Sequence, residues 1–179
     1  MADVPDKVSP AGSGSLPAGG PTPPAWGHAT GNFDLSAGPP AMLAPADRLE
    51  ITERLYRYCV GYDERRADVL RDCFTDDGVW EATITGHTAV GPFQGADEVV
   101  AFLLGFWREQ TDQRRHIFTN VFIDRAGGDR ARAICYLQLL SSRSGRAELE
   151  TTGIYRFDLR RDAGVWRITH LFAGFDSPF

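Results

Sequence analysis

The most constraining feature of the chain is a series of four long strand-like segments in its C-terminal part, joined by very short links. β-branched and aromatic residues dominate these segments, and apolar and polar residues alternate in much of their length. The links contain glycine and span only a few residues, which is typical of connections between neighbouring antiparallel strands. The strands are predicted at 114–123, 130–142, 147–159 and 165–175.

Three helices are predicted before these strands. Apolar residues recur there at helical spacing, and Asp47 and Glu50 have the spacing of a capping box at the start of the first helix. Helices followed by antiparallel strands predict an α+β fold, in which a curved, mostly antiparallel sheet forms a cone-shaped barrel packed against the helices. The helices are predicted at 46–64, 67–74 and 96–110, with one further strand at 79–84.

The composition limits the classes of protein that the chain can represent. Its 179 residues are enough for one domain with a substantial core. The net charge is −5 and the arginines are scattered in pairs, so no nucleic-acid partner is expected. No apolar run approaches a membrane span, and no secretory signal pattern is present, so no membrane partner is expected. Cys59, Cys73 and Cys135 form no Cys-x-x-Cys pair, which predicts reduced, buried thiols in a cytoplasmic protein.

The first 45 residues differ from the rest because glycine, proline, alanine and serine dominate them. A segment with so few apolar residues buries too little surface to offset the entropy that it loses on ordering. We therefore predict a flexible arm over 1–45 and a single folded domain over 46–179.

The strand at 114–123 carries a titratable side chain among aromatic ones. Side chains alternate between the two faces of a strand, which predicts that His116, Phe118, Asn120 and Phe122 share one face. A buried imidazole needs a hydrogen-bond partner, so the partner of His116 is the first residue to look for.

Several motifs resemble those of the nuclear transport factor 2-like (SnoaL-like) family, and the resemblance extends from Ala46 to Phe175. The order of helix, helix, strand, helix and four long strands is that of the family. The resemblance implies a cone-shaped fold with an internal ligand pocket. The matching stretches are 58–63 and 70–80 for the helix pair and first strand, 91–95 for the start of the third helix, and 164–168 for the last strand.

One branch of this family removes water or HCl from alicyclic substrates and includes scytalone dehydratase, hexachlorocyclohexane dehydrochlorinase and bile acid 7α-dehydratase. The stretch His116–Asn120 is similar to the His-x-x-Thr-Asn motif of the dehydrochlorinase. The resemblance implies a catalytic Asp at the end of the first helix and a catalytic His on the strand after the third. Asp63 and His116 stand at these positions, and Tyr58 corresponds to a Tyr of the bile acid enzyme.

This arrangement implies acid–base chemistry. Asp63 would accept a hydrogen bond from one ring nitrogen of His116, and the other nitrogen would remove a proton from the substrate. Tyr58 or Asn120 would donate to the oxygen on which negative charge develops. Tyr58 and Asp63 point about 140° apart on a regular helix, because they are five residues apart. Both face one pocket only if the helix end unwinds near Gly61 or the sheet wraps around the helix.

Further residues are predicted to line a pocket for a hydrophobic, cyclic small molecule. His170 is predicted on one face with Trp166 and Phe172, as packing or as pocket wall, and His87 in a loop or as a second pocket histidine. The four histidines are far apart and lack metal-ligand spacing, so neither a metal nor another cofactor is expected. The predicted substrate-binding residues are Asn120, Trp80, Phe118, Tyr136, Tyr155, His87 and His170.

Three functions remain open. The first is a cofactor-free lyase, isomerase or cyclase that uses the Asp63–His116 pair with Tyr58. The second is the small (beta) subunit of a ring-hydroxylating dioxygenase, which has the same fold and supports a larger iron-bearing subunit. The third is a non-catalytic ligand-binding or assembly module. The resemblance also implies a homodimer or homotrimer that forms through the open face of the sheet.

Overall fold

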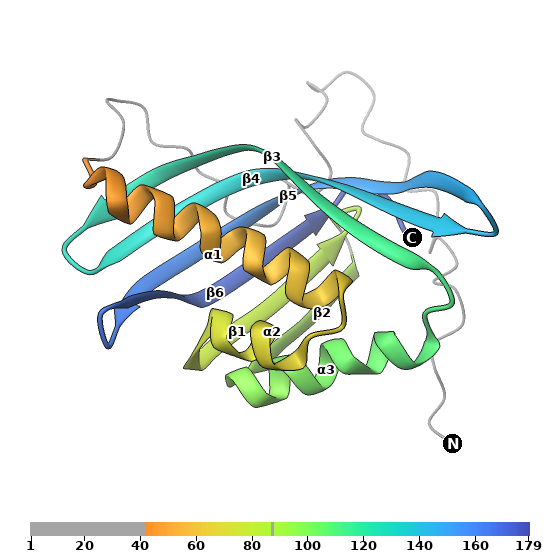
Figure 1. Ribbon diagram of the computed structural model, residues 1–179, viewed down its shortest axis with the longest axis horizontal. Helices are drawn as coiled ribbons and strands as arrows, with labels where there is room; N and C mark the ends of the chain where they lie inside the picture. Colours follow the sequence, from red (N-terminus) through yellow and green to blue (C-terminus); the bar gives the residue numbers. More distant parts are fainter. Residues whose placement is uncertain (1–41, 87) are drawn as a thin grey trace.

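The computed structural model describes residues 42–86 and 88–179, which form three helices and one sheet (Figure 1). The predicted arm over 1–45 falls almost entirely outside these residues. No helix in the described part of the chain is long and apolar enough to cross a membrane. The helices are α1 Pro45–Asp63, α2 Ala67–Cys73 and α3 Ala96–Glu109. The strands are β1 Phe74–Ile84, β2 Thr88–Gln94, β3 Gln113–Gly127, β4 Arg130–Arg143, β5 Arg146–Asp162 and β6 Val165–Phe175.

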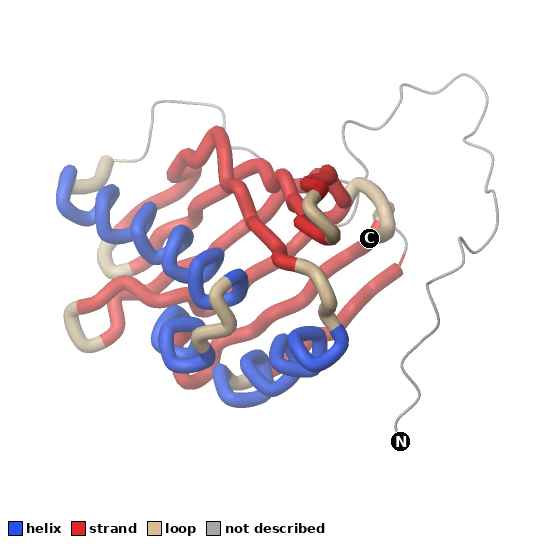
Figure 2. The backbone as a smooth tube through the Cα atoms, turned by 45° about the vertical axis from the view of Figure 1, so that its right-hand side comes forward, coloured by secondary structure: helices blue, strands red, loops and turns tan. Residues whose placement is uncertain are grey.

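The strands form one sheet in the order β2-β1-β6-β5-β4-β3. All neighbouring pairs are antiparallel except β1 and β6, which run parallel. Helix α1 crosses one face of the curved sheet, and α2 and α3 lie near β1 and β2 (Figures 1 and 2). The predicted α+β class, with a mostly antiparallel sheet and three helices, is confirmed. The sheet does not close into a barrel, because β2 and β3 form its two free edges.

Strand β2 was not expected, because Gly91-Pro92 predicted a break in the chain there. In the structure β2 pairs only with β1 and forms an edge of the sheet. A proline is tolerated on an edge strand, since its missing N–H is not needed by a second neighbour.

The start of α1 also differs from the prediction, because the capping box does not form. Ala44 is the N-cap and makes no side-chain cap, while Pro45 stands in the first turn, where proline is favoured. The two acids bind the last strand instead. Asp47 accepts a hydrogen bond from the indole nitrogen of Trp166 at 3.2 Å, and Glu50 accepts one from the Trp166 backbone N–H at 2.8 Å. These contacts tie the first turns of α1 to the start of β6.

The core lies between α1 and the face of the sheet that α1 crosses. Ile51, Leu55 and Tyr58 of α1 are buried against residues such as Phe157 and Trp166 of the sheet. The three cysteines are buried in this core and unpaired, as predicted. Burial raises the pKa of each of their thiols, that of Cys73 to about 11, so they stay protonated and unreactive.

One irregularity in β3 and one in β6 change the side of the sheet to which the next side chains of the same strand point. In β3 the register shifts between Thr119 and Phe122, with Asn120 in the left-handed region at φ 53°. Phe118 is buried before this bulge, whereas Phe122 is 41% exposed after it. The prediction that His116, Phe118, Asn120 and Phe122 share one face is therefore wrong beyond Phe118, because an inserted residue breaks the alternation.

A second register shift, in β6, separates Ile168 from His170. Ile168 and Leu171 both belong to the main core, so His170 and Phe172 point to the other side of the sheet. The prediction that His170 lies on the same face as Trp166 is therefore wrong. Phe172 instead forms a small separate cluster with Ile134 and Ile154 on the outer face, away from α1.

Gly153 allows β5 and β6 to approach closely. A Cβ atom at this position would lie 2.2 Å from the backbone oxygen of Gly174, which no backbone atom can accommodate without moving. We expect Gly153→Ala to lower the free energy of unfolding by about 2–3 kcal/mol or more, measured by urea denaturation.

Gly127→Ala is the matched control, because Gly127 also lies in a strand but a Cβ there would meet nothing within 4 Å. This variant should change the stability by less than about 1 kcal/mol. Equal losses of stability in the two variants would contradict the close approach of β5 and β6 at Gly153.

Candidate active site

Asp63 and His116 meet where the end of α1 reaches β3. The helix ends after Asp63 because the chain turns at Arg65, which has φ 55°, and the Arg66 N–H bonds to the carbonyl of Gly61 at 2.8 Å. Oδ1 of Asp63 lies 2.6 Å from Nδ1 of His116, and Oδ2 accepts the His116 backbone N–H at 2.8 Å. The predicted contact between these two side chains is therefore present, and both side chains are at least nine-tenths buried.

The geometry determines which ring nitrogen of His116 can react. The carboxylate oxygen Oδ1 accepts a hydrogen bond from Nδ1–H, so Nε2 carries the lone pair of the neutral ring. Among the described residues, Nε2 makes no hydrogen bond. A carboxylate at the C-terminal end of a helix is disfavoured by the helix dipole, and the two donors of His116 offset this cost. The arrangement can take up a proton at Nε2 and stabilise the resulting imidazolium.

Aromatic rings surround this pair, and two of them were not singled out from the sequence. The Tyr62 ring contacts the imidazole edge to face, with ring centroids 5.1 Å apart, and it also contacts Trp107 at 5.9 Å. Burial raises the pKa of Tyr62 to about 12, although Arg114 acts in the opposite direction, so the phenol stays neutral. The position of Tyr62 directly before Asp63 was the only signal of its role in the sequence.

Tyr58 faces the core at another part of α1. Its hydroxyl accepts a hydrogen bond from the indole nitrogen of Trp80 at 3.0 Å, and its ring packs edge-on against Phe74 and Phe157. Burial raises the pKa of Tyr58 well above its usual value. Helix α1 remains helical to Asp63, so its end does not unwind near Gly61.

Gly61 has a different role from the one considered in the sequence. A Cβ at this position would lie 3.0 Å from the backbone nitrogen of Leu70, so glycine allows α1 and α2 to pack closely.

Trp80, Phe118 and Tyr155 lie in the interior. Phe118 contacts Tyr155 with centroids 5.2 Å apart, and Trp80 contacts Phe102 at 5.1 Å. Their rings pack against one another and fill much of the space between α1 and the sheet. Two surface hollows of the described residues are lined by neither Asp63 nor His116.

Three of the predicted lining residues are not in this interior. Asn120 is exposed at the bulge of β3, and Tyr136 is 51% exposed, since it pairs with Ile154 on the outer face. His170 lies on the outer face, where its Nε2 is 2.8 Å from a carboxylate oxygen of Glu81. His87 lies outside the described residues. In the part of the chain that is described, no three His, Cys, Asp or Glu side chains gather as metal ligands would.

Comparison with known proteins agrees with this architecture. The family model described as the SnoaL-like domain matches residues 44–171, most of the described chain. The chain belongs to the SnoaL-like family. This assignment bears out the family resemblance, whereas the narrower branch of dehydratases stays a prediction. No curated protein matches the sequence.

Several solved structures share the fold of this SnoaL-like protein. An NTF2-like protein with a cystatin-like fold from Novosphingobium aromaticivorans is 23% identical with a TM-score of 0.64, covering 73% of this chain and 82% of its own. A protein from Catenulispora acidiphila is 27% identical with a TM-score of 0.64, covering 73% and 92%. The beta subunit of a provisionally assigned aromatic-ring-hydroxylating dioxygenase from N. aromaticivorans is 16% identical with a TM-score of 0.65, covering 75% and 92%.

The contact between α1 and β3 can be tested by stability. Asp63→Asn keeps the size of the side chain but removes the charge that accepts both hydrogen bonds of His116. We expect the free energy of unfolding to fall by about 1.5–3 kcal/mol in chemical denaturation, as for a buried charged acceptor.

Glu64→Gln provides the control, because Glu64 is the next residue and forms only an exposed ion pair with Arg115. Glu64→Gln should lower the free energy of unfolding by less than about 1 kcal/mol. An Asp63→Asn protein as stable as Glu64→Gln would show that the Asp63–His116 contact contributes little to the fold.

Proposed function

We propose that this SnoaL-like protein is a cofactor-free lyase, isomerase or cyclase that acts on a hydrophobic, cyclic small molecule. His116 is the general base, and Asp63 orients it and stabilises its protonated form. The observation that carries this proposal is the 2.6 Å contact between Asp63 Oδ1 and His116 Nδ1. That contact leaves Nε2 as the free basic atom in an apolar surrounding.

The chemistry follows from the protonation states of the pair. Nε2 of His116 removes a proton from a carbon or a hydroxyl of the substrate, and the electron pair left behind forms the new double bond or attacks within the molecule. The positive charge on the ring is stabilised by the negative charge of Asp63, which accepts the hydrogen bond of Nδ1. General acid–base catalysis of this kind contributes about 10²–10⁴-fold to the rate. Burial raises the pKa of Tyr58, so its hydroxyl keeps its proton and can donate a hydrogen bond to the departing oxygen.

The surroundings of the pair support an apolar substrate. Tyr62, Trp107 and Phe118 lie on the same side of the sheet as His116, and all three are more than nine-tenths buried. A cyclic molecule of polyketide or steroid type, from secondary metabolism or catabolism, would replace contacts that these rings make with one another. We place this activity in the cytoplasm, where the three unpaired cysteines would stay reduced.

The proposal predicts that catalysis depends on both members of the pair. In a panel of cyclic alcohols and ketones, wild-type protein should speed dehydration, or the exchange of acidic C–H protons in D₂O followed by NMR. His116→Gln should lower kcat/KM by about 10²-fold or more, because no other group can accept the proton. Asp63→Asn should lower it less, since the base remains but is poorly oriented.

Arg115→Gln is the matched control, because Arg115 neighbours His116 on β3 but is exposed and points away from the core. Its turnover should stay within about twofold of wild type. Full turnover by His116→Gln on the same substrate would refute the assignment.

A second candidate function is the small subunit of a ring-hydroxylating dioxygenase. The similarity to such a beta subunit, with a TM-score of 0.65, favours it at the level of the fold. A supporting subunit would bind a larger iron-bearing chain and would not need the Asp63–His116 pair. Co-purification with such a chain, undiminished in His116→Gln, would favour this function. A non-catalytic binding or assembly module is the third candidate. An interior filled by side chains would favour it, and the contacts of Phe118 with Tyr155 and Phe157 are of this kind.

We also propose that the chain forms a homodimer or homotrimer through the outer face of the sheet. Phe122, Tyr136 and Ile117 are 41%, 51% and 39% exposed and lie beside the buried Ile134 and Ile154. Contiguous apolar surface of this kind is typical of protein interfaces.

A charge in this surface should weaken the assembly. We expect Tyr136→Glu to shift the protein toward the monomer in size-exclusion chromatography with light scattering, because the carboxylate would have to be buried. Phe106→Glu is the control, since Phe106 is similarly exposed but lies on α3. A monomeric wild-type protein, or equal effects of both variants, would refute an interface on this face.

A further inference from the structure

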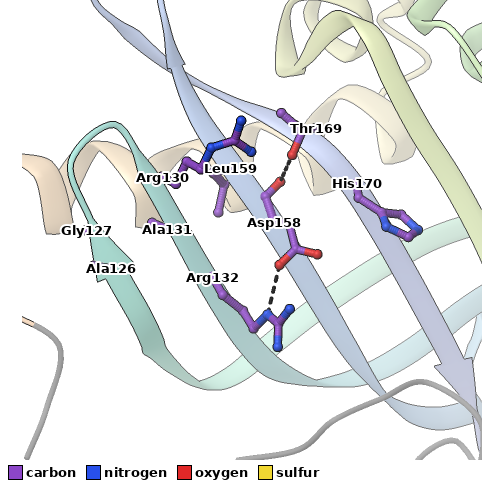
Figure 3. Close-up of a pocket in the computed structure, with 9 residues that line it drawn as sticks. All are labelled: Ala126, Gly127, Arg130, Ala131, Arg132, Asp158, Leu159, Thr169 and His170. Atoms are coloured by element: carbon purple, nitrogen blue, oxygen red, sulfur yellow. Dashed lines mark hydrogen bonds and ion pairs between the residues drawn. The ribbon is translucent and has the colours of Figure 1, made fainter. Parts of the chain in front are cut away.

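The outer face of the sheet carries a polar hollow that the proposed chemistry does not use. Its volume is about 470 Å³, within the range of small-molecule sites. It spans the ends of β3 and β4 and the neighbouring parts of β5 and β6, and the close-up shows Arg130, Arg132, Asp158 and His170 around it (Figure 3). The lining residues are Ala126, Gly127, Arg130, Ala131, Arg132, Asp158, Leu159, Thr169 and His170.

The register shift in β6 turns a histidine toward this hollow. His170 Nε2 lies 2.8 Å from Glu81 Oε1 of the parallel strand β1, and both side chains are about one-third exposed. The other ring nitrogen, Nδ1, lies 3.5 Å from a terminal nitrogen of Arg156. The imidazole is therefore held at the rim of the hollow, with a protein partner at each ring nitrogen.

Arginines outnumber carboxylates around the hollow. Nε of Arg132 donates to Asp158 Oδ1 at 2.8 Å, and Nε of Arg156 lies 3.3 Å from Asp158 Oδ2. Arg130 is exposed at the rim and forms no hydrogen bond or ion pair with any described residue. The hollow is thus lined by two guanidinium groups, those of Arg130 and Arg132, and by one carboxylate, that of Asp158, which leaves an excess of positive charge.

The hollow has a further guanidinium group close by, that of Arg156. Burial lowers the pKa of Arg156, and the nearby charge of Arg132 lowers it further, while Asp158 and Glu81 act in the opposite direction. An anion bound near Arg132 would offset the repulsion between these two arginines.

A second hollow among the described residues has more acidic than basic side chains in its lining. It lies between Arg71 and Arg167 and has a volume of about 380 Å³, but Asp68, Asp72, Asp76 and Asp162 also line it. Both of its arginines bind two acids each, so no positive charge is left for a ligand. The excess of positive charge therefore distinguishes the outer-face hollow from this second hollow, which is also lined by arginines.

We propose that the outer-face hollow binds an oxyanion, the phosphate or carboxylate group of a small molecule, through Arg130 and Arg132, beside His170 at the rim. Guanidinium groups present paired N–H donors that match the oxygens of phosphate and carboxylate. The site lies on the opposite side of the sheet from Asp63 and His116, so it is independent of the acid–base function.

Isothermal titration of the full chain with inorganic phosphate, at constant ionic strength set by chloride, tests the site. Saturable binding is expected, and Arg130→Gln should weaken it about tenfold or more, since Arg130 is the arginine with no other partner to satisfy. Arg146→Gln is the matched control, because Arg146 is exposed at the start of β5, outside the lining of the hollow, and should bind like wild type. The imidazole NMR signals of His170 should shift with the same saturation curve.

A parallel titration with acetate identifies the source of the oxyanion. Binding of acetate with the same sensitivity to Arg130→Gln indicates a carboxylate ligand, and binding of phosphate alone indicates a phosphorylated one. The absence of saturable binding of both anions, or equal weakening by Arg130→Gln and Arg146→Gln, would overturn the proposal. These readouts need no substrate, so they remain decisive if the acid–base function fails its own test.

Discussion

The two hydrogen bonds from His116 to the Asp63 carboxylate are the contact on which much of the interior depends. Strand β3 is an edge of the sheet and pairs only with β4, so its other support comes from α1. The side chain of Gln113 adds to this contact by donating to the backbone carbonyl of Asp63 at 2.8 Å. Helix α1 is anchored at its other end by Asp47 and Glu50 on β6. It is therefore held at both ends over a sheet that stays open between β2 and β3.

This anchoring explains why one polar pair persists in an aromatic interior. A buried carboxylate and a buried imidazole are each costly alone, but together they satisfy the hydrogen bonds at the end of α1 and at the start of β3. The same contact leaves one ring nitrogen without a partner among the described residues. The same two side chains thus provide a structural contact and a reactive atom. We therefore expect the stability of the fold and the rate of turnover to respond differently to substitutions of Asp63 and of His116.

The two faces of the sheet hold two carboxylate–imidazole pairs in different surroundings. His116 contacts the ring of Tyr62, which in turn contacts Trp107, so Asp63 and His116 lie in a buried, aromatic setting suited to proton transfer. Glu81 and His170 lie among guanidinium groups and are partly exposed, a setting suited to recognition of charge. Membership of the SnoaL-like family accounts for the architecture, but it does not decide between these uses, because function resides in the individual sites.

The sequence by itself determined the three helices, five of the six strands and the antiparallel links between the last four strands. These features follow from local periodicity and from short glycine-containing turns. The pairing of Asp63 with His116 was implied by the resemblance of the surrounding motifs to those of the family. Only the tertiary structure decided which side chains share a face beyond Asn120 and beyond Ile168. An inserted residue between Thr119 and Phe122 in β3, and another between Ile168 and His170 in β6, sends the side chains that directly follow to the other side of the sheet. For this reason Asn120 and His170 are absent from the interior where the sequence had placed them. Tyr136 is absent because the regular alternation of β4 places it on the outer face with Ile134. The Glu81–His170 pair requires the parallel contact of β1 with β6, so it could be found only in three dimensions.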